Sequence, residues 1–131
     1  MTRTLFKSLA AMGALALSAN AFAANDLKVK GIEVDKQDDG YHVFVEIAAA
    51  GETVGPFYVD LFEGRNFAPE VGEFGDQFKR IDWISGDGES VYVEFMMDVL
   101  PDNNWLDAIV DTDGWIDEIN ENNNHKDHRV P

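Results

Sequence analysis

Large apolar residues alternate with polar ones along most of the chain beyond residue 25. The clearest case is residues 41–48, where every second residue is apolar: Tyr41, Val43, Val45 and Ile47. Successive side chains of a strand point to opposite faces, so this spacing predicts a β-strand with one buried face. The same reasoning predicts strands at residues 26–34, 57–62, 78–84, 91–97 and 105–110. A last strand, short and polar, is expected at residues 125–130.

Turn-forming residues separate these stretches. Gly31 interrupts the first predicted strand and indicates a β-bulge. Residues 36–40 end in Asp-Asp-Gly, which favours a hairpin loop. Helical periodicity is nearly absent after residue 24. Short strands at regular spacing, with turn chemistry between them, predict an all-β antiparallel sandwich of about seven strands.

A long loop is expected at residues 63–77, between two predicted strands. Loops longer than about 12 residues often carry function. This one holds Arg65, Phe67 and Phe74, which are our candidate ligand contacts. In the alternative interpretation, both Phe rings fold back as a lid on the edge of the sandwich, because isolated rings usually find apolar cover.

The segment that follows residues 105–110 is acidic and contains the turn dipeptide Asp113-Gly114. Its carboxylates are hard oxygen ligands of the kind that Ca²⁺ prefers, and the candidate ligands are Asp111, Asp113, Asp117 and Glu118. The EF-hand pattern fails, because Ile116 stands where that loop needs Gly and Asn122 where it needs Glu. A structural calcium ion is therefore one hypothesis. The other is that these residues only hold the turn through bonds to the backbone.

The first 23 residues have the composition of a secretory signal peptide. Arg3 and Lys7 form a basic start, residues 9–19 are rich in Ala and Leu, and Ala21-Phe22-Ala23 matches a cleavage site. We therefore expect a signal-peptide helix at residues 1–23 and one exported domain at residues 24–131, in the periplasm or outside the cell. The apolar stretch is too short to span a membrane, so no membrane insertion is expected after cleavage.

The charge balance excludes some partners. The whole chain carries a formal charge of −15, and loss of the two basic residues with the signal peptide changes it to −17. Nucleic acid and anionic lipid surfaces are poor partners for such a domain. Two interpretations of the charge stay open, namely solubility of the folded domain and attraction of cations.

Residue types for nucleophilic catalysis are scarce. The chain has no Cys, so it has neither a thiol nucleophile nor a disulfide. Ser85 and Ser90 lie outside any G-x-S-x-G context. His125 and His128 form a weak candidate for a transition-metal site, since no third ligand is near them in sequence. Carboxylates are abundant, but no pair stands out, so we expect the protein not to be an enzyme.

One motif resembles a known family. Residues 110–124 read Val-Asp-x-Asp-x-x-Ile-Asp-Glu-x-Asn-Glu-x-Asn-Asn, and upstream lie Asp26-Leu27, Gly31-Ile32 and Gly55-Pro56-Phe57. Together these features resemble the bacterial cell-adhesion-related domain family, CARDB. The resemblance implies an immunoglobulin-like sandwich of seven strands, usually a module of a surface or secreted protein, with no catalytic residues. The chain departs from the family in being a single module with a short, polar last strand.

These observations favour an exported, non-catalytic module that binds an unknown protein or carbohydrate at the cell surface. The loop at residues 63–77 would present the contacts from a rigid sandwich. The alternative is an assembly subunit that pairs through an exposed strand edge, since the short last strand predicts incomplete cover of that edge. A small carboxylate-based hydrolase is the least favoured hypothesis.

Overall fold

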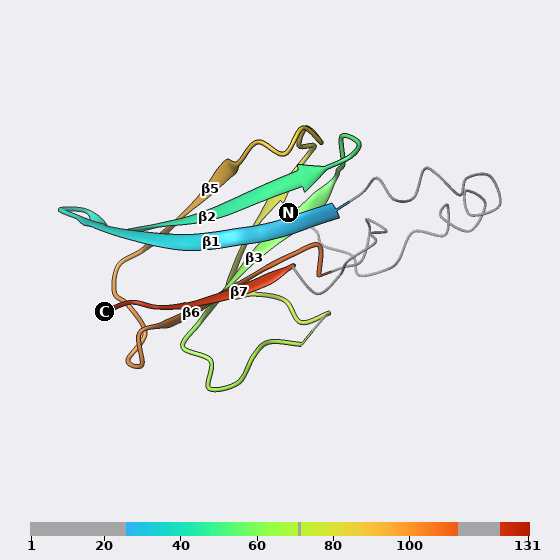
Figure 1. Cartoon of the computed structure of the whole chain (residues 1–131). Helices are drawn as coiled ribbons and strands as arrows, with labels where there is room; N and C mark the ends of the chain where they lie inside the picture. Colours follow the sequence, from blue (N-terminus) through green and yellow to red (C-terminus); the bar gives the residue numbers. More distant parts are fainter. Residues whose placement is uncertain (1–25, 71, 113–123) are drawn as a thin grey trace.

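The computed structural model describes residues 26–70, 72–112 and 124–131, and it confirms the all-β fold (Figure 1). Seven strands are present among these residues, all paired antiparallel. They are β1 (Asp26–Gln37), β2 (Gly40–Ala50), β3 (Phe57–Glu63), β4 (Gln77–Ile81), β5 (Val91–Met97), β6 (Trp105–Val110) and β7 (His125–Arg129). The expected signal-peptide helix lies outside the described residues. The described part of the chain contains no helix long and apolar enough to cross a membrane.

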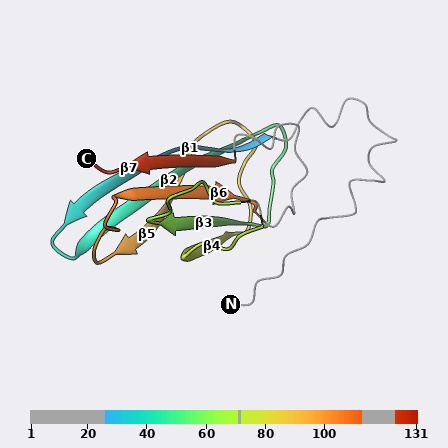
Figure 2. The ribbon, with the colours of Figure 1, turned by 90° about the horizontal axis from the view of Figure 1, so that it is seen from below.

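The strands form two packed sheets, one of order β1-β2-β5 and one of order β4-β3-β6-β7 (Figures 1 and 2). In the constant-type immunoglobulin domain the fourth strand joins the sheet of the first, second and fifth. In this chain β4 pairs with β3 instead, so the sheet of the first strand has three strands and the opposite sheet has four. Strands β1 and β7 lie side by side at one flank of the sandwich.

The core fills the space between the sheets with the apolar residues that the alternation predicts. From β2 come Val43, Val45 and Ile47, and all three are fully buried. The opposing sheet contributes Phe57, Val59 and Leu61 from β3, and Leu106, Ala108 and Val110 from β6. The predicted bulge in β1 is also confirmed, since the register with β2 shifts between Val29 and Gly31.

The outer face of the four-stranded sheet is buried as well, which the alternation alone does not predict. Tyr58, Asp60 and Phe62 lie on the side of β3 away from the core, and none of them is more than 1% exposed. The described residues of the loop at 64–76, which are 64–70 and 72–76, cover this face. Gly75 lies so close to β3 that a Cβ atom on it would meet the backbone of Leu61 at 2.7 Å. The loop is therefore a third layer over part of the sandwich.

The predicted strand at residues 78–84 is present, but it begins one residue earlier, at Gln77, and ends earlier than predicted. The observed strand β4 ends at Ile81, which packs against the core. Trp83 is 68% exposed, so it is not a core residue. Phe78 pairs with Asp60 on the outer face, where its ring meets that of Tyr58 edge-on at 5.5 Å. The pairing of β4 with β3 thus places Phe78 on the outer face, beside Tyr58.

Candidate functional site

Hydrogen bonds hold both ends of the loop at residues 64–76 to the sheet. Gly64 begins the loop with a φ of 70°, which Gly adopts without strain. Its N–H donates to the backbone carbonyl of Trp105 on β6 at 2.9 Å. At the other end the N–H of Gly75 donates to the buried carboxylate of Asp60 at 2.9 Å. Anchors at both ends restrict the positions that the loop side chains adopt.

The middle of the loop is held by Thr112 and Arg65. The N–H of Gly72 donates to Oγ1 of Thr112 at 2.7 Å. A guanidinium N–H of Arg65 donates to the carboxylate of Glu73 within the loop, at 2.6 Å. The same guanidinium lies 5.1 Å from the centre of the buried Phe62 ring. Arg65 therefore joins the loop to itself and to the sheet beneath it.

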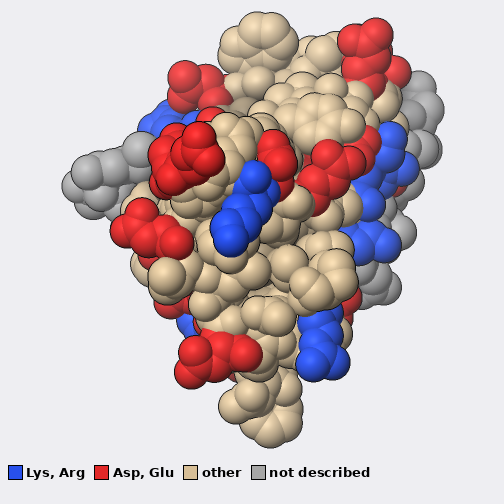
Figure 3. All heavy atoms as spheres, turned by 90° about the vertical axis from the view of Figure 1, so that its left-hand side faces the viewer, with Lys and Arg blue, Asp and Glu red and all other residues tan. Residues whose placement is uncertain are grey.

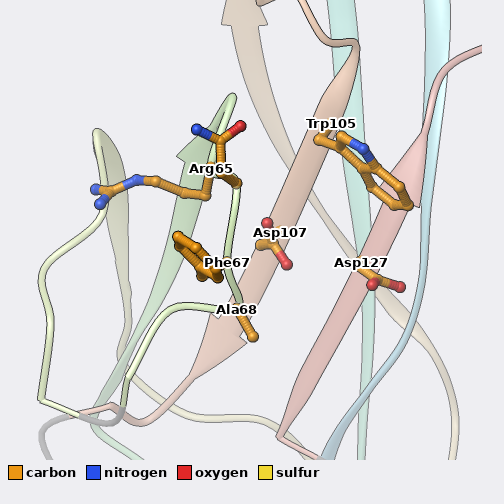
Figure 4. Close-up of a pocket in the computed structure, with 7 residues that line it drawn as sticks. Arg65, Phe67, Ala68, Trp105, Asp107 and Asp127 are labelled. Carbon is orange, nitrogen blue, oxygen red and sulfur yellow. The ribbon is translucent and has the colours of Figure 1, made fainter.

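A pocket lies between this loop and strands β6 and β7 (Figure 4). Its volume is about 170 Å³. We call it the Phe67 pocket, and its lining residues are Arg65, Asn66, Phe67, Ala68, Trp105, Asp107 and Asp127. The first four come from the loop and the other three from strands, so the pocket joins an irregular wall to a rigid floor.

Two carboxylates form the floor. Asp107 on β6 is directly opposite Asp127 on β7, so both side chains point to the same outer face. Asp107 is only 5% exposed, and its Oδ1 lies 2.8 Å from Nε2 of His125, with which it forms a hydrogen bond. Asp127, in contrast, is exposed to solvent. The floor thus holds one desolvated and one solvated acid.

Burial raises the pKa of Asp107 above its ordinary value of 3.8. The hydrogen bond from His125 and the charge of Arg65 both act in the opposite direction, whereas the charge of Asp127 raises the pKa further. A carboxylate in such surroundings gains more from a nearby cation than a solvated one does, because its charge is less screened.

Aromatic rings form the walls. Phe67 is 85% exposed, the highest value among the large apolar side chains of the described residues. The guanidinium of Arg129 lies 6.0 Å from the centre of the Trp105 ring. In Figure 4 the Arg65 side chain extends away from Asp107, toward the far side of the loop. The charged end of Arg65 therefore lies away from the pocket floor.

The predicted ligand contacts are brought together only in part. Arg65 and Phe67 line the pocket, but Phe74 does not; it is 43% exposed at the other end of the loop. The alternative interpretation, in which both Phe rings fold back as a lid, is wrong for Phe67, whose ring stays in solvent. Sequence reasoning missed Trp105, Asp107 and Asp127 as site residues. Alternation does place the first two on one face of β6, but Asp127 joins them only through the register of β7.

The calcium hypothesis stays a prediction. Of the four proposed ligands, Asp113, Asp117 and Glu118 lie outside the described residues. Asp111 is buried, has a φ of 54° and donates its N–H to the carbonyl of Tyr58 at 2.9 Å, which fits a turn-forming role. Across residues 26–70, 72–112 and 124–131, no three His, Asp or Glu side chains are grouped so that they could hold a metal ion.

The transition-metal alternative at the last strand fails on geometry. The pairing of β6 with β7 places His125 opposite Ile109 and His128 opposite Leu106. Residues three apart on a strand point to opposite faces, so the two His rings cannot share an ion. His125 forms a hydrogen bond with Asp107 instead.

A second polar cluster lies on the outer face of the three-stranded sheet. The two ring nitrogens of His42 lie 2.7 Å from a Glu94 oxygen and 2.8 Å from an Asp39 oxygen. Hydrogen bonds to Glu94 and Asp39, in that order of importance, raise the pKa of His42. A protonated ring donates to both acids, so this cluster ties the β1–β2 hairpin to β5.

Comparisons of the chain with protein-family models, curated proteins and solved structures find no match.

Proposed function

We propose that this protein is an exported, non-catalytic binding module whose binding surface is the Phe67 pocket. The observation that carries the proposal is the 85% exposure of Phe67 beside a pocket with a buried carboxylate. Burying such a ring stabilises a contact by roughly 1.5–3 kcal/mol, and the domain itself does not use this gain. An exposed ring on an anchored loop is thus available to a ligand at little ordering cost.

The construction of the loop supports the same proposal. Binding residues commonly lie on loops that a rigid scaffold positions. Here the scaffold is the four-stranded sheet, and the anchors at Gly64 and Gly75 fix the loop at both ends. Phe67 lies between them, so its position is restricted although its ring is exposed.

The proposal includes the family of the domain and its location outside the cytoplasm. The segment at residues 110–124 motivates membership of the CARDB family, and the seven-stranded sandwich is compatible with it. The first 23 residues motivate export to the periplasm or the cell exterior. Under this proposal the ligand is a protein or a carbohydrate at the cell surface.

A test must separate binding from stability. The protein and its Phe67→Ala variant would be applied to arrays of glycans and of surface peptides, with thermal melting measured in parallel. We expect unchanged melting and loss of the signals that the parent gives. Equal signals from both proteins would overturn the proposal, and so would a sharp fall in melting temperature, because the ring would then be part of the core. Val99→Ala, which removes another exposed apolar side chain, is the matched control.

Self-assembly through a strand edge is a second candidate, supported by a different observation. Strand β5 is the last strand of its sheet, and Val91, Tyr92 and Met96 on it are each more than 40% exposed. We favour the β5 edge for pairing over the β7 edge, because β7 lies beside β1. Sedimentation over a wide concentration range tests it, because a strict monomer excludes self-pairing.

The Asp107–Asp127 pair gives some support to the least favoured hypothesis, a carboxylate-based hydrolase. Two carboxyls of unlike environment are what glycoside hydrolysis requires. Incubation with chromogenic glycosides tests it. Release of the chromophore by the parent and not by Asp107→Asn would favour an enzyme over a binding module.

A further inference from the structure

We propose that the Phe67 pocket recognises a guanidinium group, either an arginine side chain of a partner protein or a small free guanidine. This inference rests on the proposed function and specifies the chemistry of its ligand. It follows from three properties of the pocket, namely its charge, its rings and its size.

The charge of the pocket floor is incompletely compensated. The described residues give Asp107 one hydrogen-bond partner, His125, and that bond uses only Oδ1. They give Asp127 no ion pair. The guanidinium of Arg65 pairs with Glu73 and extends away from Asp107 in Figure 4, so its charge compensates that of Asp107 only from a distance. A cation entering the pocket would therefore meet two acceptors on the floor, one of them desolvated.

Net charge alone does not explain this arrangement. Acidic side chains are scattered over the face drawn in Figure 3 and do not gather in one patch. The charge of −15 steers cations toward the molecule as a whole. Local geometry selects among them, and only a pocket that buries a carboxylate gives the desolvation that strengthens a charge-assisted hydrogen bond.

The rings favour a planar cation. A guanidinium stacks on aromatic faces and binds carboxylates through two parallel N–H bonds, whereas an ammonium is a strongly hydrated point charge. The protein already places guanidinium groups against two rings of this region, those of Phe62 and Trp105. None of the cation–ring contacts among the described residues uses Phe67, so its face is available.

The size favours a head group over a whole ligand. Pockets for complete small molecules measure roughly 300–1,000 Å³, and this one measures about 170 Å³. A guanidinium and the start of its alkyl chain fit such a space, and the rest of the ligand would lie outside. A sugar ring is the competing occupant, since it also combines ring stacking with hydrogen bonds to carboxylates. It carries no positive charge, so it neutralises the desolvated charge of Asp107 less well than a guanidinium does.

The test is a titration with N-acetyl-arginine amide, followed by isothermal calorimetry and by Trp fluorescence. The neutral isostere N-acetyl-citrulline amide and the ammonium analogue N-acetyl-lysine amide run alongside. We expect a dissociation constant of about 1 mM for the arginine compound, as is usual for a ligand of this size. Binding of the lysine compound should be weaker and that of the citrulline compound absent.

Variants locate the site. Asp127→Asn should weaken binding about tenfold through loss of a charged acceptor. Phe67→Ala should weaken it at least about threefold through loss of the ring. Asp98→Asn removes an exposed acid that does not line the pocket, so it should leave binding unchanged beyond the small effect of net charge. Asp127 and Phe67 are exposed, so these variants should fold like the parent, which their melting temperatures check.

The outcomes separate this inference from the proposed function. No binding of the arginine compound, equal binding of the citrulline compound, or equal loss in Asp98→Asn and Asp127→Asn would each overturn the guanidinium assignment. If a neutral monosaccharide binds instead and Phe67→Ala abolishes it, the binding module stands and only its ligand class is wrong. An arginine-containing peptide that binds at least tenfold more tightly than the free amide identifies a protein partner as the source, and equal affinity identifies a small free guanidine.

Discussion

Replacement of Phe62 by Ala tests whether the loop at residues 64–76 covers the sheet. Phe62 points away from the core, yet its exposed fraction is 0% because the loop and the Arg65 guanidinium lie over it. Truncation of a fully buried Phe costs about 3–5 kcal/mol of unfolding free energy, through lost transfer energy and the cavity left behind. If the outer face were open to solvent, the cost would be about 0.5 kcal/mol.

A matched control exists on the other sheet. Phe44 lies on the outer face of β2 and is only partly buried. Strand β2 has a neighbour on both sides in its sheet, as β3 has in the other sheet. Urea unfolding followed by circular dichroism gives both free energies by linear extrapolation. We expect the Phe62→Ala cost to exceed the Phe44→Ala cost by at least about 2 kcal/mol, with a fall in melting temperature of about 12–20 °C for Phe62→Ala. Equal costs for the two variants would refute the covering role of the loop.

Three further predictions concern single residues. Hydrogen bonding to Glu94 raises the pKa of His42, so protonated His42 stabilises the folded protein fully below the ordinary pKa of about 6.5, and this stabilisation is lost as pH rises through the folded pKa. The melting-temperature difference between the parent and His42→Gln should therefore shrink from pH 5 to pH 9, and a constant difference would contradict this. Burial raises the pKa of Asp107, so folding favours its protonated form, and the parent should lose stability relative to Asp107→Asn as pH rises from 3.5 to 7. Thermal melts of both proteins at the two pH values test this, and a gain in stability of the parent relative to the variant would contradict it. Gly55 has a φ of 150° and a Cβ on it would overlap the backbone carbonyl of Asp82, so Gly55→Ala should cost at least about 1–3 kcal/mol in chemical unfolding, and an unchanged midpoint would exclude the strain.

The strands were largely predictable because their core faces follow a period of two. Val43, Val45 and Ile47 recur at every second position of β2, and Phe57, Val59 and Leu61 do so on β3, so strand type and the core face follow from this period of two. The bulge at Gly31 was predictable for a similar reason, since a Gly breaks the phase of the apolar residues. These features depend on residues that are neighbours in sequence.

The site was only half predictable because its parts come from three distant segments. Arg65 and Phe67 were accessible to sequence reasoning, since an aromatic residue in a long polar loop is conspicuous. Asp107 and Asp127 are two acids among 25, and only the pairing of β6 with β7 places them opposite each other. Burial of the outer face of β3 depends on where the loop at residues 64–76 lies, and the periodicity of the strands does not predict that.

The most direct test of the central claim, that the Phe67 pocket is a binding site for a cationic head group, is to map where the ligand binds. Amide and indole signals of the ¹⁵N-labelled protein would be followed by NMR during a titration with N-acetyl-arginine amide. The account predicts saturable shifts confined to residues 65–68, the Trp105 indole and the strand segments around Asp107 and Asp127. Shifts that increase without saturation over the whole acidic surface, or that centre on the β1-β2-β5 sheet, would contradict it.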